Sequence, residues 1–149
     1  MRIAIGSDHA GFELKQELRT YIEGLGHTVL DVGAHAERPG DDYPDYADAL
    51  GTALRAGQVD RGVLVCGSGV GVSVAANKMP GVRAAVCHDV HSAHQCVEHD
   101  DVNVMCIGAQ IVGPWLAKDL VAAYLDARFS TDEDFRRRVA KLAEMDAGR

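Results

Sequence analysis

Short apolar runs rich in valine, isoleucine and leucine recur along the chain, and each is followed by a stretch whose apolar residues are spaced every three or four positions. Apolar runs of this length are typical of buried strands, and the spacing between them is typical of amphipathic helices. Strands that alternate with helices form βαβ units, which favour a parallel sheet covered on both faces. The strands are predicted at residues 2–6, 27–33, 62–66, 82–87 and 102–108.

The helical stretches complete an α/β fold. They are predicted at residues 10–24, 45–55, 89–99, 113–129 and 132–145, with one more directly after the glycines that follow residue 66. No internal repeat, low-complexity tract or linker divides the 149 residues. We therefore predict a single Rossmann-like three-layer domain over residues 1–149, with a five-stranded parallel sheet and a C-terminal helix.

Ligands of such folds bind beyond the carboxyl ends of the strands, where the winding of the sheet reverses. If the strand order is 2-1-3-4-5, the first and third strands are neighbours at that point. This order would bring Asp8 and His9, which follow the first strand, close to Cys66 and Ser68, which follow the third.

The net charge and the cysteines bear on which binding partners and which cellular compartment are expected. The net charge is −7, from 15 basic and 22 acidic residues, so no basic face for nucleic acid or a membrane surface is expected. A few local donors could still hold one small anion. The N-terminus has no signal-peptide core and no apolar run reaches a membrane span, so we expect a cytoplasmic protein. None of the four cysteines forms a C-x-x-C pair, and Cys87 and Cys106 have the apolar surroundings of core residues.

The segment "CGSGVG", residues 66–71, is the strongest chemical signal. It matches neither the G-x-G-x-x-G dinucleotide fingerprint nor a phosphate-binding loop that ends in G-K-[ST]. Its glycines allow successive N–H groups to point into one hollow, where they favour an anion. Cys66 would be a nucleophile or base there, or else a buried structural thiol. Ser68 would bond the sulfur or a substrate, or else cap the following helix.

Three other polar clusters have both a structural and a functional interpretation. Asp8 and His9 would cap a helix or contact a ligand, and Tyr43 precedes a helix where it would line a site. The histidines between residues 88 and 99 raise the possibility of a metal site, but their spacing completes no ligand pattern, so no metal is predicted. His99 ends its predicted helix and would face the carboxyl edge of the sheet. Successive arginines near the C-terminus would form a solvated face or reach an anion, also across a subunit boundary.

Together, five segments resemble the ribose-5-phosphate isomerase B / galactose-6-phosphate isomerase family of sugar-phosphate isomerases. The resemblance covers almost the whole chain, although each segment alone would be weak. The segments are "IAIGSDHAGFELK" (3–15), "DYPDYA" (42–47), "GVLVCGSGVGVSVAANKMPGVRAAVC" (62–87), "EHDDVNVMCIGAQIVG" (98–113) and "RRV" (137–139).

The resemblance implies an aldose–ketose isomerase that needs no metal or organic cofactor and whose sites lie between subunits of a homodimer, in some members paired into tetramers. It implies that Cys66 moves a proton between C1 and C2, that Ser68 orients Cys66, and that His99 opens the sugar ring. The remaining implied substrate contacts are Asp8, His9, Tyr43, the loop amides of Gly67, Gly69, Val70 and Gly71, Asp100 and Arg138.

The sequence departs from the family pattern at positions that the resemblance assigns to phosphate binding. Asp100 stands where ribose-phosphate members usually have asparagine, Gln110 where they have arginine, and Asp134 and Phe135 where they have an arginine–histidine pair; Arg138 matches. Each lost charge-assisted contact is worth roughly 1.5–3 kcal/mol, so a sugar other than ribose 5-phosphate is a real alternative. A tetrose phosphate, a hexose phosphate or an unphosphorylated sugar would undergo the same chemistry.

Two alternatives come from other classes. One is a non-catalytic module that binds a small anion on the same fold. The other is a thiol redox protein that uses Cys66, although no resolving cysteine lies close to it in the sequence.

Overall fold

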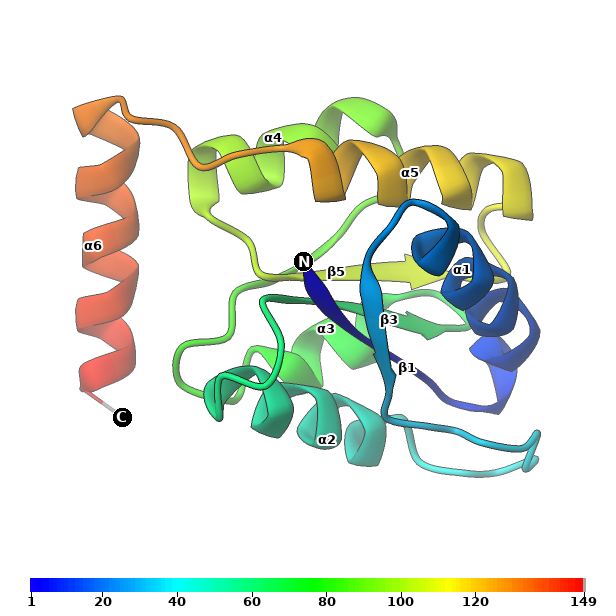
Figure 1. The fold of residues 1–149 in the computed structure, drawn as a ribbon. Coiled ribbons are helices and arrows are strands. Elements are labelled where there is room, and N and C mark those ends of the chain that lie inside the picture. The colour runs from blue at the N-terminus through cyan, green and yellow to red at the C-terminus, as the bar shows by residue number, and fades with distance from the viewer. Residues whose placement is uncertain (149) are drawn as a thin grey trace.

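A computed structural model describes residues 1–148 and contains one parallel sheet of five strands in the order β2-β1-β3-β5-β4. The predicted α/β fold class is confirmed. The strands are β1 (Arg2–Ser7), β2 (Thr28–Asp31), β3 (Arg61–Cys66), β4 (Ala84–Val86) and β5 (Val104–Gly108). Figure 1 shows helices on both sides of this sheet.

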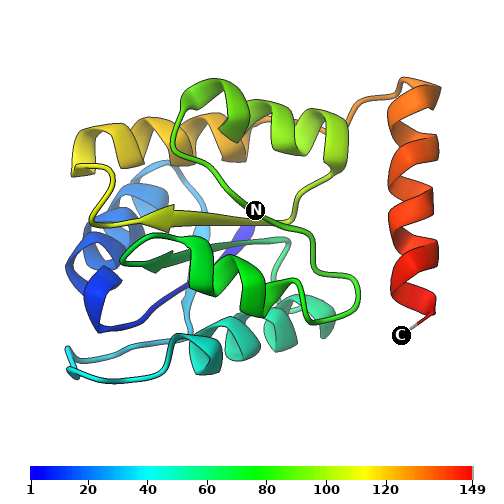
Figure 2. The same cartoon turned by 180° about the vertical axis from the view of Figure 1, so that it is seen from behind.

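Two separate apolar cores lie on the two faces of the sheet. On one face, α1 (Phe12–Gly24), α4 (Val90–Asp100) and α5 (Pro114–Asp126) pack on the strands, and on the other α2 (Tyr43–Arg55) and α3 (Val70–Ala76) do so. The two figures place α4 and α5 above the sheet and α2 and α3 below it (Figures 1 and 2). The three predicted layers are therefore present.

The expected order 2-1-3-4-5 is wrong in its last two strands. β5 lies next to β3, and β4 is the edge strand. All five residues of β5 are buried, whereas β4 has only three residues, which are half-buried or exposed. A fully apolar strand gains most from the centre of the sheet, where both faces are covered. The adjacency of β1 and β3, on which the predicted site depends, is confirmed.

The last helix, α6 (Glu133–Ala147), stands apart from the layers. None of its residues is buried, and its neighbour in the fold is α4. In both views it lies beside the edge of the sheet where the strands begin, and residues 127–132 connect it to α5 (Figures 1 and 2). Among residues 1–148, no helix is both long enough and apolar enough to cross a bilayer.

Gly11 lies where the chain turns from β1 into α1, at the end of a short 3₁₀ helix (His9–Gly11). A Cβ on this residue would lie 2.5 Å from the carbonyl oxygen of Val65 and 2.7 Å from its carbonyl carbon. Only glycine allows the 3₁₀ turn to approach β3 this closely, and the approach sets Asp8 and His9 beside the end of β3.

We predict that Gly11→Ala lowers the free energy of unfolding by about 2 kcal/mol or more, because the clash is with backbone atoms that cannot rotate away. Gly24→Ala is the matched control, since its Cβ would meet nothing within 4 Å. The control should be neutral or stabilise the protein by up to about 1 kcal/mol. Urea titration followed by circular dichroism measures both, and equal effects of the two substitutions would contradict the assignment.

Candidate active site

The carboxyl edge of the sheet collects the segments that follow β1, β3 and β5. Ser7 pairs with Val65 and Cys66 pairs with Gly108, so the three strands end at the same level. Asp8 and His9, the glycine loop from residue 66 to 71, and Gln110 follow directly. The predicted meeting of Asp8 and His9 with the glycine loop thus rests on strand register.

The Cys66 thiol lies at the inner end of this edge. Its sulfur accepts the N–H of Gly69 at a nitrogen–sulfur distance of 3.1 Å. The residue is only 5% exposed and packs within the α2/α3 core. The expectation of a packed thiol is confirmed, and the sulfur also contacts the glycine loop. Cys106 lies in the same core, where burial raises the pKa of its thiol, so it remains a protonated core residue.

The glycine loop presents main-chain donors. Within residues 1–148, the N–H groups of Gly67, Ser68 and Gly71 have no hydrogen-bond partner. The N–H of Val70 donates to the Ser68 hydroxyl at 3.2 Å. Ser68 thus bonds the first residue of α3, but the N-cap position itself is occupied by Gly69 rather than by Ser68. Gly69 adopts φ +80°, which turns its N–H back toward the sulfur. Three amides are thus available to a negatively charged oxygen.

Two side chains form the walls around the loop. The Tyr43 ring lies over Gly71, because a Cβ there would meet ring atoms at 2.9–3.1 Å. The Gln110 amide lies over Gly67, where the corresponding distances are 3.1–3.5 Å. Tyr43 is 40% exposed, so its ring lies between the loop and solvent. Gln110 contributes a neutral amide at a position where the family resemblance expected a cation.

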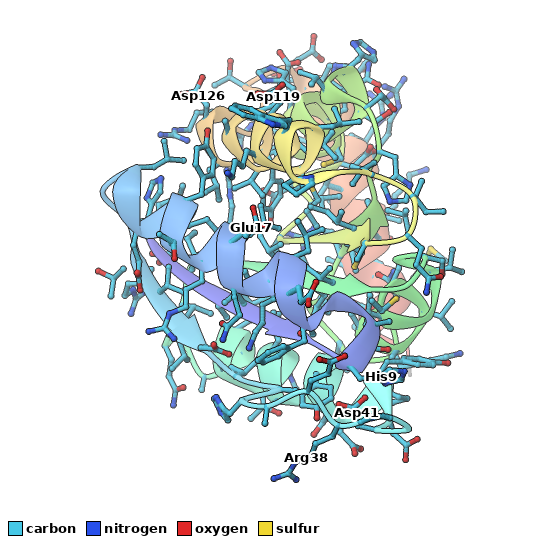
Figure 3. The ribbon with its side chains drawn as sticks, turned by 90° about the vertical axis from the view of Figure 1, so that its right-hand side faces the viewer. His9, Glu17, Arg38, Asp41, Asp119 and Asp126 are labelled. Atoms are coloured by element: carbon cyan, nitrogen blue, oxygen red, sulfur yellow. The ribbon has the colours of Figure 1, made fainter. Side chains whose placement is uncertain are left out.

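Asp8 and His9 have different environments. Asp8 is buried, and its carboxylate accepts the N–H groups of Ala10 and Gly11 at 3.0 and 3.2 Å, which confirms the capping interpretation. His9 is half-exposed, and its Nδ1 lies 2.6 Å from a carboxylate oxygen of Asp41. Figure 3 shows His9 and Asp41 side by side near the end of the β1 segment. Asp41 was not recognised in the sequence, because it belongs to a polar loop without periodicity.

Asp8, His9 and Asp41 are also the one group in residues 1–148 that brings three potential metal ligands within 4.8 Å of one another. Hydrogen bonds within the protein already use Oδ1 of Asp8 and Nδ1 of His9. The histidines between residues 88 and 99 do not converge on a point. His88 Nε2 instead accepts the N–H of Gly108 at 2.8 Å, which supports the end of β5 under the glycine loop.

His99, Asp100 and Arg138 lie at the opposite edge, and the expectation that His99 would face the carboxyl edge is wrong for a single copy. α4 runs back against the strand direction, and the chain re-enters the sheet at Val104, opposite Gly62 at the start of β3. Gly62 and Cys66 are four residue steps apart along β3, which is about 13 Å. The sequence pattern placed these residues near a strand but did not fix which end.

An aromatic stack organises this second cluster. The imidazole of His99 lies on the Phe135 ring of α6 with centroids 3.9 Å apart and planes 13° from parallel. The guanidinium of Arg138 lies 5.6 Å from the centre of the same ring. Arg137, in contrast, pairs with Asp134 at 2.6 Å. One imidazole and one guanidinium are therefore held together on the face formed by α4 and α6.

Comparison with known proteins agrees with this arrangement. Residues 3–142 match the Ribose/Galactose Isomerase family. The chain is 45% identical to ribose-5-phosphate isomerase B of Escherichia coli over 129 residues, 86% of this chain and 85% of that protein. It is 40% identical to D-erythrulose-4-phosphate isomerase of Pectobacterium atrosepticum over 87% of this chain and 85% of that one.

A solved structure of ribose-5-phosphate isomerase B from Clostridium thermocellum superimposes with a TM-score of 0.95 at 40% identity, and covers 99% of both chains. The similarity thus extends over the sheet, the glycine loop and the last helix alike. The chain belongs to the ribose/galactose isomerase family and is an aldose–ketose isomerase of the sugar-phosphate class.

Proposed function

We propose that this protein interconverts an aldose phosphate and a ketose phosphate through a cis-enediolate, with Cys66 as the base. The observation that carries the proposal is the position of the Cys66 sulfur beside a loop with three unpartnered N–H groups. The thiolate takes the proton from the carbon next to the carbonyl, and the electron pair forms the enediolate. The thiol then returns a proton, which has exchanged with solvent in part of the turnovers, to the neighbouring carbon. No electrons leave the substrate, and no cofactor is required.

The loop amides supply the second requirement of this reaction. Proton removal beside a carbonyl places negative charge on the carbonyl oxygen, and fixed donors that point at that oxygen lower the barrier. Loss of one such donor typically costs about 3 kcal/mol. The N–H groups of Gly67, Ser68 and Gly71 are fixed by the backbone and need no reorganisation when the charge develops.

We further propose that residues 1–149 act as one domain in a homodimer, or in a pair of such dimers, with each site shared between two copies. His99 and Arg138 are too distant from Cys66 in one copy to act on the same small sugar. A symmetric dimer can bring the α4/α6 face of one copy to the carboxyl edge of the other. The exposed side chains of Leu142 and Met145 on α6 support the contact, because a second copy would cover them.

The sugar itself is proposed as a phosphate of four to six carbons. Ribose 5-phosphate is supported by the overall similarity, and Arg138 remains as a phosphate ligand next to His99. A tetrose or hexose phosphate is supported by Gln110 and Phe135, which replace charged groups of ribose-phosphate members. Asp134 repels a phosphate less than its sequence position suggests, because Arg137 pairs with it.

We expect Cys66→Ala to abolish isomerisation while the far-UV circular dichroism stays that of the native protein, because the base is lost and a smaller side chain fills the same core site. The assay is a panel of tetrose, pentose and hexose phosphates with their unphosphorylated counterparts, run in D₂O. Incorporation of deuterium at C1 or C2 by the native protein supports the enediolate route. Binding without exchange for every sugar would indicate an anion-binding module, and full activity of Cys66→Ala would remove the base.

The shared site predicts complementation between two inactive variants. Cys66→Ala and His99→Ala should each be impaired, yet a mixture that is unfolded and refolded together should recover about a quarter of native activity, since half of the dimers are mixed and each has one intact site. Mixing without subunit exchange is the control. No recovery in verified mixed dimers would show that both residues act from the same copy.

A further inference from the structure

The loop between β2 and α2 is hydrogen-bonded to the end of β1 near its start, and Asp41 lies close to its far end. The N–H of Ser7 donates to the carbonyl of Gly33, and the N–H of Ala34 donates to the carbonyl of Ser7, each at 2.7 Å. Lys15, fully buried, bonds Asp31 at 2.8 Å and also the carbonyl of Ala34. The start of the loop is therefore fixed, while its far end reaches the carboxyl edge.

Asp41 at that far end collects three donors. One carboxylate oxygen accepts the N–H of His9 at 2.9 Å and faces His9 Nδ1 at 2.6 Å, and the other accepts the hydroxyl of Tyr46 at 2.8 Å. The Asp41 side chain is 11% exposed, whereas that of His9 is 38% exposed. The carboxylate is thus enclosed, and the imidazole projects from it toward solvent.

We propose that Asp41, held by Tyr46, is a positioning residue for His9 that fixes the ring through Nδ1 and leaves Nε2–H as a donor toward the oxygens of the bound sugar phosphate. This inference rests on the proposed function, since it gives His9 a role in the same site. Nε2 of His9 has no hydrogen-bond partner within residues 1–148, and His9 follows β1 where that strand pairs with β3, the strand that ends at Cys66.

The electrostatics of the cluster favour the protonated ring. The hydrogen bond that the His9 ring donates to Asp41 is the main reason that the pKa of His9 is raised. Desolvation opposes the increase, and the charges of Asp8, Asp41 and Glu37 add to it. Desolvation alone would raise the pKa of Asp41, but the hydrogen bonds from His9 and Tyr46 leave it lowered. The cluster therefore favours the protonated form of the His9 ring over the neutral form.

An ordinary ion pair that only fastens the loop would explain part of this geometry. It would not require the third bond from Tyr46, whose own pKa is raised by burial and then by Asp41. Nor would it require the other ring nitrogen to be left without a partner. A carboxylate that holds one ring nitrogen while the other faces a reactant is a general way to fix the tautomer and direction of a histidine.

The test compares Asp41→Asn with Asp42→Asn. Both remove one negative charge from adjacent positions, but Asp42 makes no side-chain capping bond to α2. In Asp41→Asn, we expect kcat/KM for the active sugar to fall about tenfold or more, as for loss of one charge-assisted contact, and its alkaline limb to move to lower pH. Asp42→Asn should keep the native pH dependence of kcat/KM. Asp41→Glu should recover part of the kcat/KM that Asp41→Asn loses.

Titration of the His9 ring by NMR provides a readout independent of turnover. The native ring should stay protonated above pH 6.5, and in Asp41→Asn the midpoint should move down. Because the folded-state pKa is raised, the stabilisation by this pair is present below about pH 6.5 and is lost as pH rises through the native midpoint. The stability difference between native protein and Asp41→Asn should shrink over that range.

An unchanged His9 midpoint in Asp41→Asn, or a pH profile identical to that of Asp42→Asn, would overturn the proposal. If Asp41→Asn does not fold, a native His9 midpoint at or below pH 6.5 overturns it as well. Failure of Cys66→Ala to lose activity concerns only the base. The two proposals therefore fail on different observations.

Discussion

Close contact between the glycine loop and the end of β5 is the constraint on which the carboxyl edge depends. A Cβ on Gly108 would lie 2.6 Å from the carbonyl carbon of Ser68, and one on Gly69 would lie 3.0 Å from that of Ile107. Only hydrogens fit between the two backbones. In this arrangement the Gly69 N–H bonds the sulfur of Cys66, and the N–H groups of Gly67, Ser68 and Gly71 have no partner within residues 1–148. The position of the Cys66 thiol beside the glycine loop is therefore set by main-chain packing rather than by other side chains.

The spacing of residue types along the sequence was sufficient to predict most of the fold and, within the candidate site, the glycine loop. Each predicted strand and helix is present, because continuous apolar runs and helical spacing leave few alternatives. The glycine loop was recognisable because its residue types are restricted by backbone geometry. The order of β4 and β5 in the sheet could not be predicted in this way, because it depends on which strand buries more surface against the helix layers on both faces. That comparison involves contacts between segments distant in the chain.

Two features of the site required the three-dimensional arrangement. His99 ends a helix that lies next to a strand, but only the direction of α4 shows that it lies at the amino edge. Asp41 belongs to a loop with no periodicity, and its importance comes from three donors supplied by His9 and Tyr46. In both cases the sequence specifies the residue type, whereas long-range packing specifies its partners.

The position of α6 outside the layered core has a consequence for how such enzymes diverge. None of its residues is buried, so substitutions there disturb little of the hydrophobic packing that maintains the sheet. Under the proposed function, the α6 side chains that contact the sugar can thus vary at small thermodynamic risk, while Cys66 stays in the packed interior. Within this architecture, a change of substrate could therefore come from substitutions in α6, without changes in the core.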